Sequence, residues 1–407
     1  RRGALMLSIS VHHPQVLDFV KIKRDLKKVT GANISVRISD DFMKAVKAGS
    51  DYVQQWPIDS EAPEIHNTVS AQSVWDEIIE SAHASAEPGI LFWDTAKNQT
   101  PSDIYEEEGF GSTSTNPCGE IILSPGDSCR LMLVNLTSFV ENPWEDNAKF
   151  DYEKYVSVVR KSQRLMDDMI DLELEQIDKI IAKVDSDPEP ENVKRIEKEL
   201  WQFIKSRAID GRRTGLGVTG VGDALAMLGQ KYGSEESIST VEMFYKHLAI
   251  GSYTESINLA KERGSFPICD TRKEEGHPFL SRIIDELPES TREDYYTYGR
   301  RNIANTTTAP AGSVSTLTQT TSGIEPAFML HYTRRRKINP QDGDVRIDFI
   351  DDLGDNWQEY TVYHHKFKDW IAAKINSGEA NAQIEYDNDH LVSLSPYSGA
   401  TANEIDW

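Results

Sequence analysis

The feature that most constrains the fold of this chain is the alternation of short apolar segments with long amphipathic ones. Residues 4–9, 33–38 and 89–93 form short runs rich in aliphatic side chains, which predicts β-strands. Apolar residues at helical spacing predict two long helices, over 151–184 and 191–209. Strands mixed with long helices indicate an α/β architecture.

The rest of the chain continues this mixture. Further helices are expected over 14–28, 221–229 and 236–263. Residues 129–140 are expected to form an apolar core stretch, and residues 306–318 a strand–turn–helix. On the first long helix, the expected core-facing side chains are Leu165, Met169, Ile170, Leu172 and Leu174. With no fixed-period repeat and no convincing linker, the sequence predicts a single domain over 1–407.

Charge and cysteine content exclude several classes of protein. With 44 basic and 66 acidic residues, the net charge of −22 argues against direct nucleic-acid binding, although a local pocket can still hold a nucleotide. No apolar run approaches the roughly 18 residues that a membrane span needs, so no membrane partner is expected. Three cysteines do not make a secreted disulfide framework, which predicts a cytoplasmic protein.

Both ends of the sequence are abrupt. The chain opens at Arg1-Arg2-Gly3 without a methionine, runs directly into an apolar segment, and stops at Trp407 without a polar tail. We expect the two ends to be cuts through a larger fold.

The segment Asn116-Pro117-Cys118-Gly119-Glu120 places an amide, a thiol and a carboxylate within five residues. Because Pro117 fixes its own φ and Gly119 permits a sharp turn, these groups can project from one tight loop toward a common point. Cys129 lies eleven residues after Cys118. This spacing fits neither a CxxC redox pair nor a zinc motif. The two thiols are therefore candidates for nucleophilic, redox or radical chemistry, or else small buried hydrophobic residues.

Residues 215–220 match the pattern GxGxxG of dinucleotide-binding proteins. That fingerprint must follow a strand, whereas here the glycines follow a charged, helical stretch. We interpret them as small residues at a close helix contact. A nicotinamide-dependent dehydrogenase remains an alternative that a strand immediately before Gly215 would favour and a helix there would exclude.

Three other groups of residues invite a functional interpretation. The small-residue turn 308–315, which enters a predicted helix, offers backbone N–H groups and hydroxyls to a phosphate, or is an ordinary capped turn. The pairs His12/His13 and His364/His365 lack the spacing of a zinc motif, so surface or packing roles are expected and no metal site is predicted. Cys269 is interpreted as a packed or free thiol.

Several of these motifs, in this order, resemble the catalytic α chain of ribonucleotide reductases. Residues 116–120 resemble the finger loop that carries the thiyl-radical cysteine. The other similar segments are 1–4 with His13-Pro14 (the exit of the second specificity loop, with the strand and helix after it), 211–217 (a glycine-rich helical stretch), and 300–326 (the phosphate-binding turn and the strand after it). The resemblance runs nearly end to end.

This resemblance implies a ten-stranded α/β barrel of the ribonucleotide reductase and glycyl-radical type, with a central finger loop, incomplete at both ends. It implies that Cys118 becomes the thiyl radical that abstracts the ribose 3′-hydrogen, that Glu120 is the general base and that Asn116 orients the substrate. Cys129 would be one of two reducing thiols that form a disulfide during turnover. The substrate phosphates would be held by Ala311, Gly312, Ser313 and Val314, and Arg1 would lie at the specificity loop.

The motifs most resemble the adenosylcobalamin-dependent (class II) branch, which makes deoxyribonucleotides for DNA replication, here expected from diphosphates. An external dithiol such as thioredoxin, nucleoside triphosphate effectors that act allosterically, and a homodimer are implied by the family. A class I α chain with a separate radical-generating subunit is the main alternative. Its stacked tyrosines would lie beyond Trp407, and Tyr295-Tyr296 are interpreted as ordinary helix residues.

Two departures from the family pattern matter. The family's effector-binding helix, first specificity loop and C-terminal shuttle cysteines are expected outside this stretch, so we expect no turnover from the 407 residues by themselves. The second reducing cysteine belongs to a strand upstream of Arg1, and no residue of this chain replaces it. A non-enzymatic acidic helical scaffold is a more distant alternative, and it predicts that replacing Cys118 by serine leaves function untouched.

Overall fold

The structure is a computed structural model that describes residues 3–25, 27–339, 341–377 and 388–405. The chain divides into two compact units, each assembled from three stretches of sequence. Unit 1 consists of Arg1–Leu131, Lys161–Gly215 and Ser252–Ala309, and unit 2 of Met132–Arg160, Leu216–Gly251 and Pro310–Trp407. The prediction of one domain over 1–407 stays a prediction.

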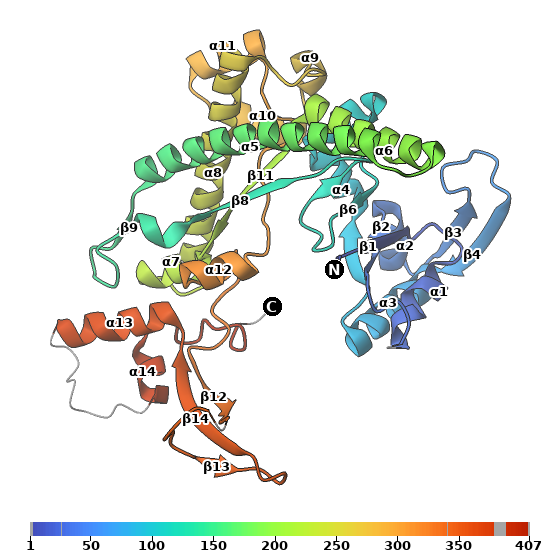
Figure 1. Ribbon diagram of the computed structural model, residues 1–407. Helices are drawn as coiled ribbons and strands as arrows, with labels where there is room; N and C mark the ends of the chain where they lie inside the picture. The colour runs from blue at the N-terminus through green and yellow to red at the C-terminus, as the bar shows by residue number, and fades with distance from the viewer. Residues whose placement is uncertain (1–2, 26, 340, 378–387, 406–407) are drawn as a thin grey trace. The chain divides into compact units, whose positions relative to one another are not determined.

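Unit 1 begins with a three-stranded parallel sheet in the order β1-β2-β5 (Figure 1). Its strands are β1 (Met6–Ser10), β2 (Asn33–Ile38) and β5 (Gly89–Phe92), as the apolar runs predicted. The covering helices are α1 (Val16–Lys21), α2 (Asp40–Ala48) and α3 (Ala71–Ser85). A continuous core that includes Val36, Phe42 and Ile78 joins this sheet to its helices. The sheet supplies a rigid base for the segment that carries Cys118.

The first helix is shorter than the predicted 14–28. It ends at Lys21 and is followed by a single 3₁₀ turn, η1 (Ile22–Arg24). Only Val16 and Val20 of α1 are buried, and the polar residues after them offer no apolar face to extend the helix against the sheet. An antiparallel hairpin, β3 (Asp51–Trp56) and β4 (Ile65–Ser70), completes this part of the unit.

The two predicted long helices are present as α5 (Tyr152–Ser186) and α6 (Glu191–Gly211). Their predicted core face is wrong except for Ile170, because Leu165, Met169 and Leu172 are exposed and Leu174 is only half-buried. The buried apolar side chains of α5 are Tyr155, Val159, Met166, Ile170, Ile177 and Val184. At about 100° per residue this set forms one stripe. The exposed Leu165 and Leu172 lie roughly a third of a turn to one side of it, and Leu174 lies on its other side.

Strand β11 (Thr214–Thr219) comes almost directly after α6 and pairs with β8 (Arg130–Asn135). The glycine-rich stretch is therefore a buried strand and not the helical contact that we expected. Helix α6 ends because Arg212 adopts the left-handed conformation, with φ of 46°. Since a helix precedes the glycines, and the glycines lie within a strand, the dinucleotide-fingerprint interpretation is excluded.

The remaining helices of unit 1 are short, and two long helices, α5 and the later α8 (Glu235–Arg263), have residues in both units. The helices before Cys118 are α4 (Trp93–Gln99), η2 (Pro101–Tyr105) and η3 (Glu106–Phe110), and the later ones are α9 (Thr271–Glu274), α10 (Pro278–Ile284) and α11 (Glu289–Tyr298). Helix α8 matches the prediction of 236–263 closely. Tyr295 and Tyr296 lie within α11, as predicted.

Unit 2 is built around a cluster of aromatic and aliphatic side chains that includes Leu330, Phe367, Trp370 and Tyr397. Its helices are η4 (Leu136–Phe139), α7 (Val221–Met227), α12 (Gly312–Thr318), α13 (His365–Asn376) and α14 (Asn388–Leu394). Its strands are β9 (Val140–Glu141), β10 (Lys149–Phe150), β12 (His331–Lys337), β13 (Phe349–Ile350) and β14 (Asn356–Tyr363). Of the strand–turn–helix predicted over 306–318, the helix is present from Gly312, but the described residues 306–311 form no strand beyond a single bridge residue, Thr306.

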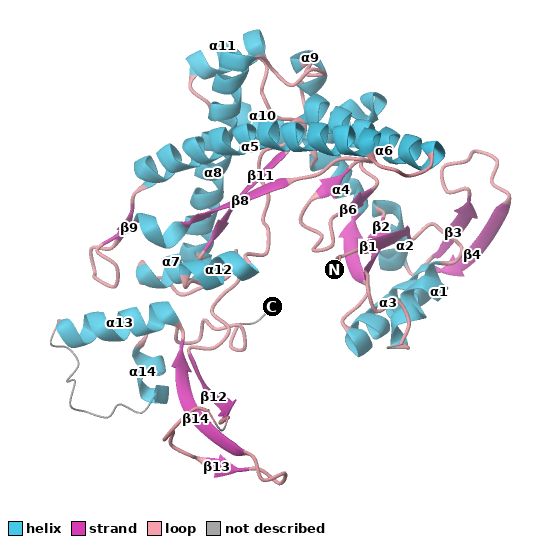
Figure 2. Ribbon diagram, in the orientation of Figure 1, coloured by secondary structure: helices cyan, strands magenta, loops and turns pink. Residues whose placement is uncertain are grey.

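The described strands form small sheets of two or three strands each, and none of them closes on itself (Figure 2). The α/β class is thus confirmed, while the described strands do not themselves trace a ten-stranded barrel.

Candidate active site

The segment that carries Cys118 is the tip of a β-hairpin. Strands β6 (Ser114–Thr115) and β7 (Ile122–Leu123) pair antiparallel, with Thr115 opposite Ile122. Asn116 closes the loop, because its backbone N–H donates to the Ile121 carbonyl and its Oδ1 accepts from the Ile121 N–H, both at 3.1 Å. Gly119 has φ of +83°, so the turn requires a residue that tolerates the left-handed region.

The hairpin is fastened to unit 1 mainly through its backbone. Asn33 of β2 donates its side-chain amide to the Pro117 carbonyl at 2.7 Å, and Thr307 donates its hydroxyl to the Glu120 carbonyl at 3.0 Å. At the base of the hairpin, Arg37 donates to the Thr113 carbonyl at 3.1 Å. These contacts hold the loop in place without using the side chains of Cys118 or Glu120.

The two reactive side chains of the loop are both available. Cys118 is a free, exposed thiol. Glu120 is half-buried, and its Oε2 is fully buried without a hydrogen-bond partner among the residues that the structure describes. A buried carboxylate oxygen without a partner is costly, and it is suited to take a proton from a ligand hydroxyl. The loop thus presents a sulfur with an acid/base group two residues away.

Cys129 lies immediately before β8 and belongs to the same unit. Burial raises the pKa of its thiol to about 12, and the charges of Asp127 and Glu120 act in the same direction, against Arg213 and Arg130. Cys129 is therefore a protonated thiol at neutral pH, able to give up a hydrogen atom or a proton.

Gly215 explains how the Cys129 sulfur fits against β11. A Cβ at Gly215 would lie 2.4 Å from Cys129 Sγ and 3.0 Å from a methyl group of Thr307. The first glycine of the GxGxxG pattern thus makes room for the thiol, and the same Thr307 holds the Glu120 carbonyl. Cys129, Gly215, Thr307 and Glu120 form one continuous set of neighbours.

The small-residue turn lies in unit 2 and is described there by itself. Gly312, Ser313 and Val314 form the exposed first turn of α12, and none of their backbone N–H groups donates a hydrogen bond within the described residues. The N–H of Ala311 is already taken, since it donates to Ser322 Oγ at 3.1 Å. The exposed amides at 312–314, together with the Ser313 hydroxyl, are the groups available to an anion.

Residues 1–386 match the family described as ribonucleotide reductase, barrel domain. The chain belongs to the ribonucleotide reductase barrel family. This confirms the resemblance that the motifs predicted.

Individual relatives of this ribonucleotide reductase domain agree. A vitamin B12-dependent ribonucleoside-diphosphate reductase of Mycobacterium tuberculosis (strain CDC 1551 / Oshkosh) is 30% identical over 337 residues, which are 82% of this chain and 40% of that protein. The enzyme of the same name from Thermoplasma acidophilum is 30% identical over 336 residues, or 82% of this chain and 37% of that protein. The chain thus spans about 40% of the length of these relatives.

A solved structure shows the same fold. The α subunit of the Actinobacillus ureae class Id ribonucleotide reductase has a TM-score of 0.54 and 18% identity to this chain, and it covers 81% of this chain and 50% of its own. Among the described helices of this reductase domain, none combines the length and the apolar character needed to cross a membrane.

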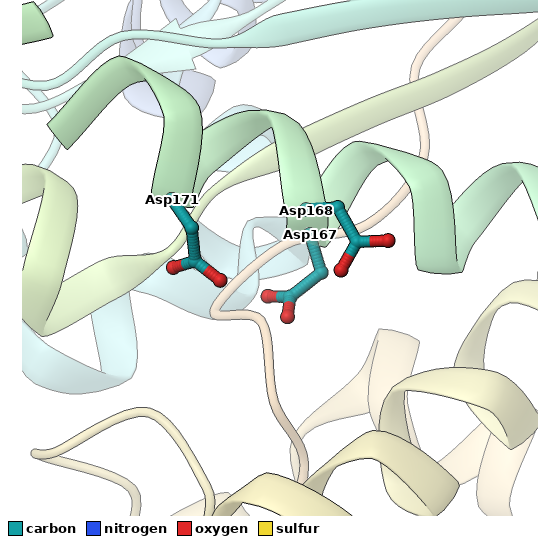
Figure 3. Close-up of side chains that lie close together, drawn as sticks. All are labelled: Asp167, Asp168 and Asp171. Atoms are coloured by element: carbon teal, nitrogen blue, oxygen red, sulfur yellow. The ribbon is translucent and has the colours of Figure 1, made fainter. Parts of the chain in front are cut away.

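An acidic cluster on α5 lies outside the hairpin and Cys129. Asp167, Asp168 and Asp171 place carboxylate oxygens within 4.8 Å of one another (Figure 3). Their partners are Arg212 (to Asp167 and Asp171, both 2.8 Å), Arg263 (to Asp168, 2.6 Å, and Asp167, 3.3 Å) and Arg301 (to Asp167, 3.3 Å). Three arginines balance three carboxylates, so the cluster is an ion-pair network that ties α5 to the ends of α6 and α8 and to the segment after α11.

The remaining predicted residues are Arg1, the histidine pairs and Cys269. Arg1 lies outside the described residues. His13 packs against Trp56, and His364 Nε2 donates to the Asp223 carboxylate at 2.7 Å, so these histidines have packing and hydrogen-bonding roles. Cys269 packs against a cluster of buried side chains, as predicted.

Sequence reasoning missed the groups that surround the predicted residues. Asn33 and Thr307 hold the hairpin, while Asp127, Arg130 and Arg213 surround Cys129 with buried charge. A signal was present for two of these residues, because Asp127 and Arg130 lie within two positions of Cys129.

Proposed function

We propose that this chain is the catalytic core of a ribonucleotide reductase that converts ribonucleoside diphosphates to 2′-deoxyribonucleotides for DNA synthesis. The observation that carries the proposal is the hairpin, on which a free exposed thiol, Cys118, stands two residues from a carboxylate with an unpartnered buried oxygen, Glu120. The family to which the chain belongs and the names of its relatives support the same reaction.

In this proposal Cys118, as a thiyl radical, takes the 3′-hydrogen of the ribose. Glu120 accepts the proton of the 3′-hydroxyl, which its free Oε2 is suited to do. Cys129, whose raised pKa keeps it protonated, supplies hydrogen as the 2′-hydroxyl leaves as water. Asn116 fixes the loop and orients the substrate, within a single catalytic barrel domain over 1–407.

The cofactor that we propose is adenosylcobalamin, which the relatives' names specify for those proteins. The chain fits such a group, because the Cys118 thiol is exposed at the tip of the hairpin and can be reached from outside the fold. When bound, adenosylcobalamin would supply the radical that Cys118 receives. A separate radical-generating subunit would then not be needed.

The remaining roles belong to the same proposal. The substrate phosphates would be held by the turn Ala311, Gly312, Ser313 and Val314, mainly through the exposed amides at 312–314. The enzyme would be cytoplasmic and homodimeric, regulated by nucleoside triphosphates at a site that includes Arg1, and re-reduced by a dithiol such as thioredoxin.

The test is deoxynucleotide formation from CDP under anaerobic conditions, in the protein that contains these 407 residues, with a dithiol and with or without adenosylcobalamin. We expect product only with the cobalamin. Cys118→Ser should abolish turnover with an unchanged circular dichroism spectrum, and Glu120→Gln should lower kcat by about 10²- to 10⁴-fold. Cys269→Ala is the matched control and should retain activity.

Two results would change the conclusion. Product that requires a radical-bearing partner chain in place of the cobalamin would assign the protein to class I. Unchanged turnover in Cys118→Ser would refute the radical role of the hairpin.

A further inference from the structure

Two buried arginines stand beside Cys129 and have no role in the reaction as proposed. Arg213 is 3% exposed and Arg130 is 6% exposed at the side chain, and both belong to the same unit as Cys129. Arginine is rarely this buried unless its charge is paired and its donors are satisfied.

Each guanidinium is held in place by hydrogen bonds that some of its nitrogens donate. Arg213 Nε donates to Asp127, which is itself 1% exposed. Arg130 Nε donates to Glu173, and its Nη1 donates to the carbonyls of Ser128 (3.0 Å) and Arg213 (3.4 Å). These bonds fix the planes of both groups.

One terminal nitrogen of each guanidinium donates no hydrogen bond within the described part of the chain. Nη2 of Arg130 and Nη2 of Arg213 are buried and have no hydrogen-bond partner among the described residues. Leaving such a charged donor unpaired costs more than leaving a neutral one, so the arrangement favours an anion or a strong acceptor at this place. The charged groups that act on the Cys129 thiol are Arg213, Asp127, Arg130 and Glu120, and the two arginines are the ones that favour its ionised form.

We propose that Arg130 and Arg213 are positioning residues that stabilise the thiolate of Cys129, which is released when a disulfide at Cys129 is reduced by an external dithiol. This inference rests on the proposed function for the existence of that disulfide. It assigns the two arginines to the re-reduction half of the catalytic cycle.

The chemistry requires such a group. A dithiol reduces a protein disulfide in two exchange steps, in each of which an attacking thiolate forms a new sulfur–sulfur bond and one protein sulfur leaves with the electron pair of the broken bond. Cys129 leaves as a thiolate in one of the two steps, whichever sulfur is attacked first, and then takes a proton. The dithiol loses two protons and two electrons and becomes a disulfide.

Burial alone would make this step slow, because a thiolate with a high pKa is a poor leaving group. The guanidiniums offset part of that penalty. Lysine could not replace arginine fully. Its single ammonium lacks the planar set of nitrogens, of which some fix the group and another stays free for the thiolate. The Asp127 carboxylate holds Arg213 in place, but its negative charge acts on the Cys129 thiol against that of Arg213.

The experiment measures the thiolate directly and needs no turnover. The reduced protein is alkylated anaerobically with iodoacetamide at pH 8.5, and the modification rates of the Cys118, Cys129 and Cys269 peptides are followed by mass spectrometry. We expect Arg130→Gln to slow alkylation of Cys129 by about tenfold, equivalent to about one unit of pKa. Arg130→Lys should slow it less, and the rate at Cys269 should not change.

Two matched variants separate charge from structure. Glu173→Gln removes the partner of Arg130 but keeps its charge, so the Cys129 rate should not fall. Because Arg213→Gln alone would strand the buried carboxylate of Asp127, it is made in the Asp127→Asn background and compared with Asp127→Asn alone. Asp127→Asn should raise the Cys129 rate, and the added Arg213→Gln should lower it about tenfold.

The inference is overturned if both arginine substitutions leave the Cys129 rate within twofold of their parents. It is also overturned if Glu173→Gln slows Cys129 as much as Arg130→Gln, since the ion pair would then act only through structure. If Arg130→Gln does not fold, Arg130→Lys and the Asp127→Asn pair decide. Because no nucleotide is present, these outcomes are independent of whether the protein reduces ribonucleotides.

Discussion

Replacing Gly215 by alanine tests whether this glycine exists to make room for the Cys129 sulfur. The new Cβ would lie 2.4 Å from Sγ, about 1 Å short of the 3.4 Å at which ordinary van der Waals contact begins. Side-chain carbons of Thr307 and Leu131 lie 3.0 and 3.1 Å from the same Cβ and prevent it from shifting sideways. The Cys129 sulfur itself must therefore move. Overpacking of this kind costs about 1–3 kcal/mol of stability.

A displacement of about 1 Å at a reacting atom can lower activity by about 10²-fold. We therefore expect Gly215→Ala to lose deoxynucleotide formation by about that factor, with a lower urea midpoint and an unchanged fold by circular dichroism. The control is Gly31→Ala, because no atom lies within 4 Å of the position of its Cβ and no effect is expected.

A double-mutant cycle makes the prediction specific to the sulfur. In a Cys129→Ala background the closest contact is gone, so Gly215→Ala should cost about 1 kcal/mol less than it does in the parent. Equal costs in both backgrounds, or full activity of Gly215→Ala, would refute the reasoning that connects this glycine with Cys129.

Three further predictions concern the rest of the fold and the phosphate turn. Glu274→Gln should lower the free energy of unfolding by about 3–5 kcal/mol, measured by urea denaturation, because it leaves the fully buried Arg300 unpaired. Burial raises the pKa of the Glu274 carboxyl, but the charge of Arg300 and hydrogen bonds from Arg300 and Tyr105 lower it further than burial raises it, so its folded pKa lies below the ordinary value. Its contribution is then fully present above the unfolded-state pKa of about 4.3 and is lost as pH falls, so the urea midpoint should drop on acidification, and less so in Glu274→Gln. Ser322→Ala removes the Oγ that holds the Ala311 N–H and so loosens the turn that presents the amides of 312–314. The KM for the nucleotide should rise several-fold with little change in kcat, and an unchanged KM would contradict a role of this turn in phosphate binding.

The sequence allowed prediction of those elements whose signals are local. Strand 33–38 was predicted to the residue because Ile34, Val36 and Ile38 alternate with polar residues, and the helix predicted over 236–263 differs by one residue at its start. The hairpin loop was also predictable, since an amide, a proline, a thiol, a glycine and a carboxylate in direct succession restrict both shape and chemistry.

Features set by distant partners could not be predicted. Gly215 and Gly217 argue against a strand by propensity, and they occupy one because β11 is completely buried and must leave space for Cys129. The exposed and buried faces of α5 are roughly a third of a turn apart and both carry apolar residues, so tertiary packing selects between them. Arg213 meets Asp127 across 86 positions of sequence, which no local pattern reveals.

The attachment of the hairpin through the carbonyls of Pro117 and Glu120 has a consequence for how this loop can change. Every amino acid supplies the same carbonyl, so the anchoring is indifferent to which side chain stands at position 118 or 120. Substitutions there can alter the reaction while the frame that presents it stays still. The side chains of the loop can therefore be exchanged while its backbone anchoring is kept, and a change of chemistry in this fold needs no change of architecture.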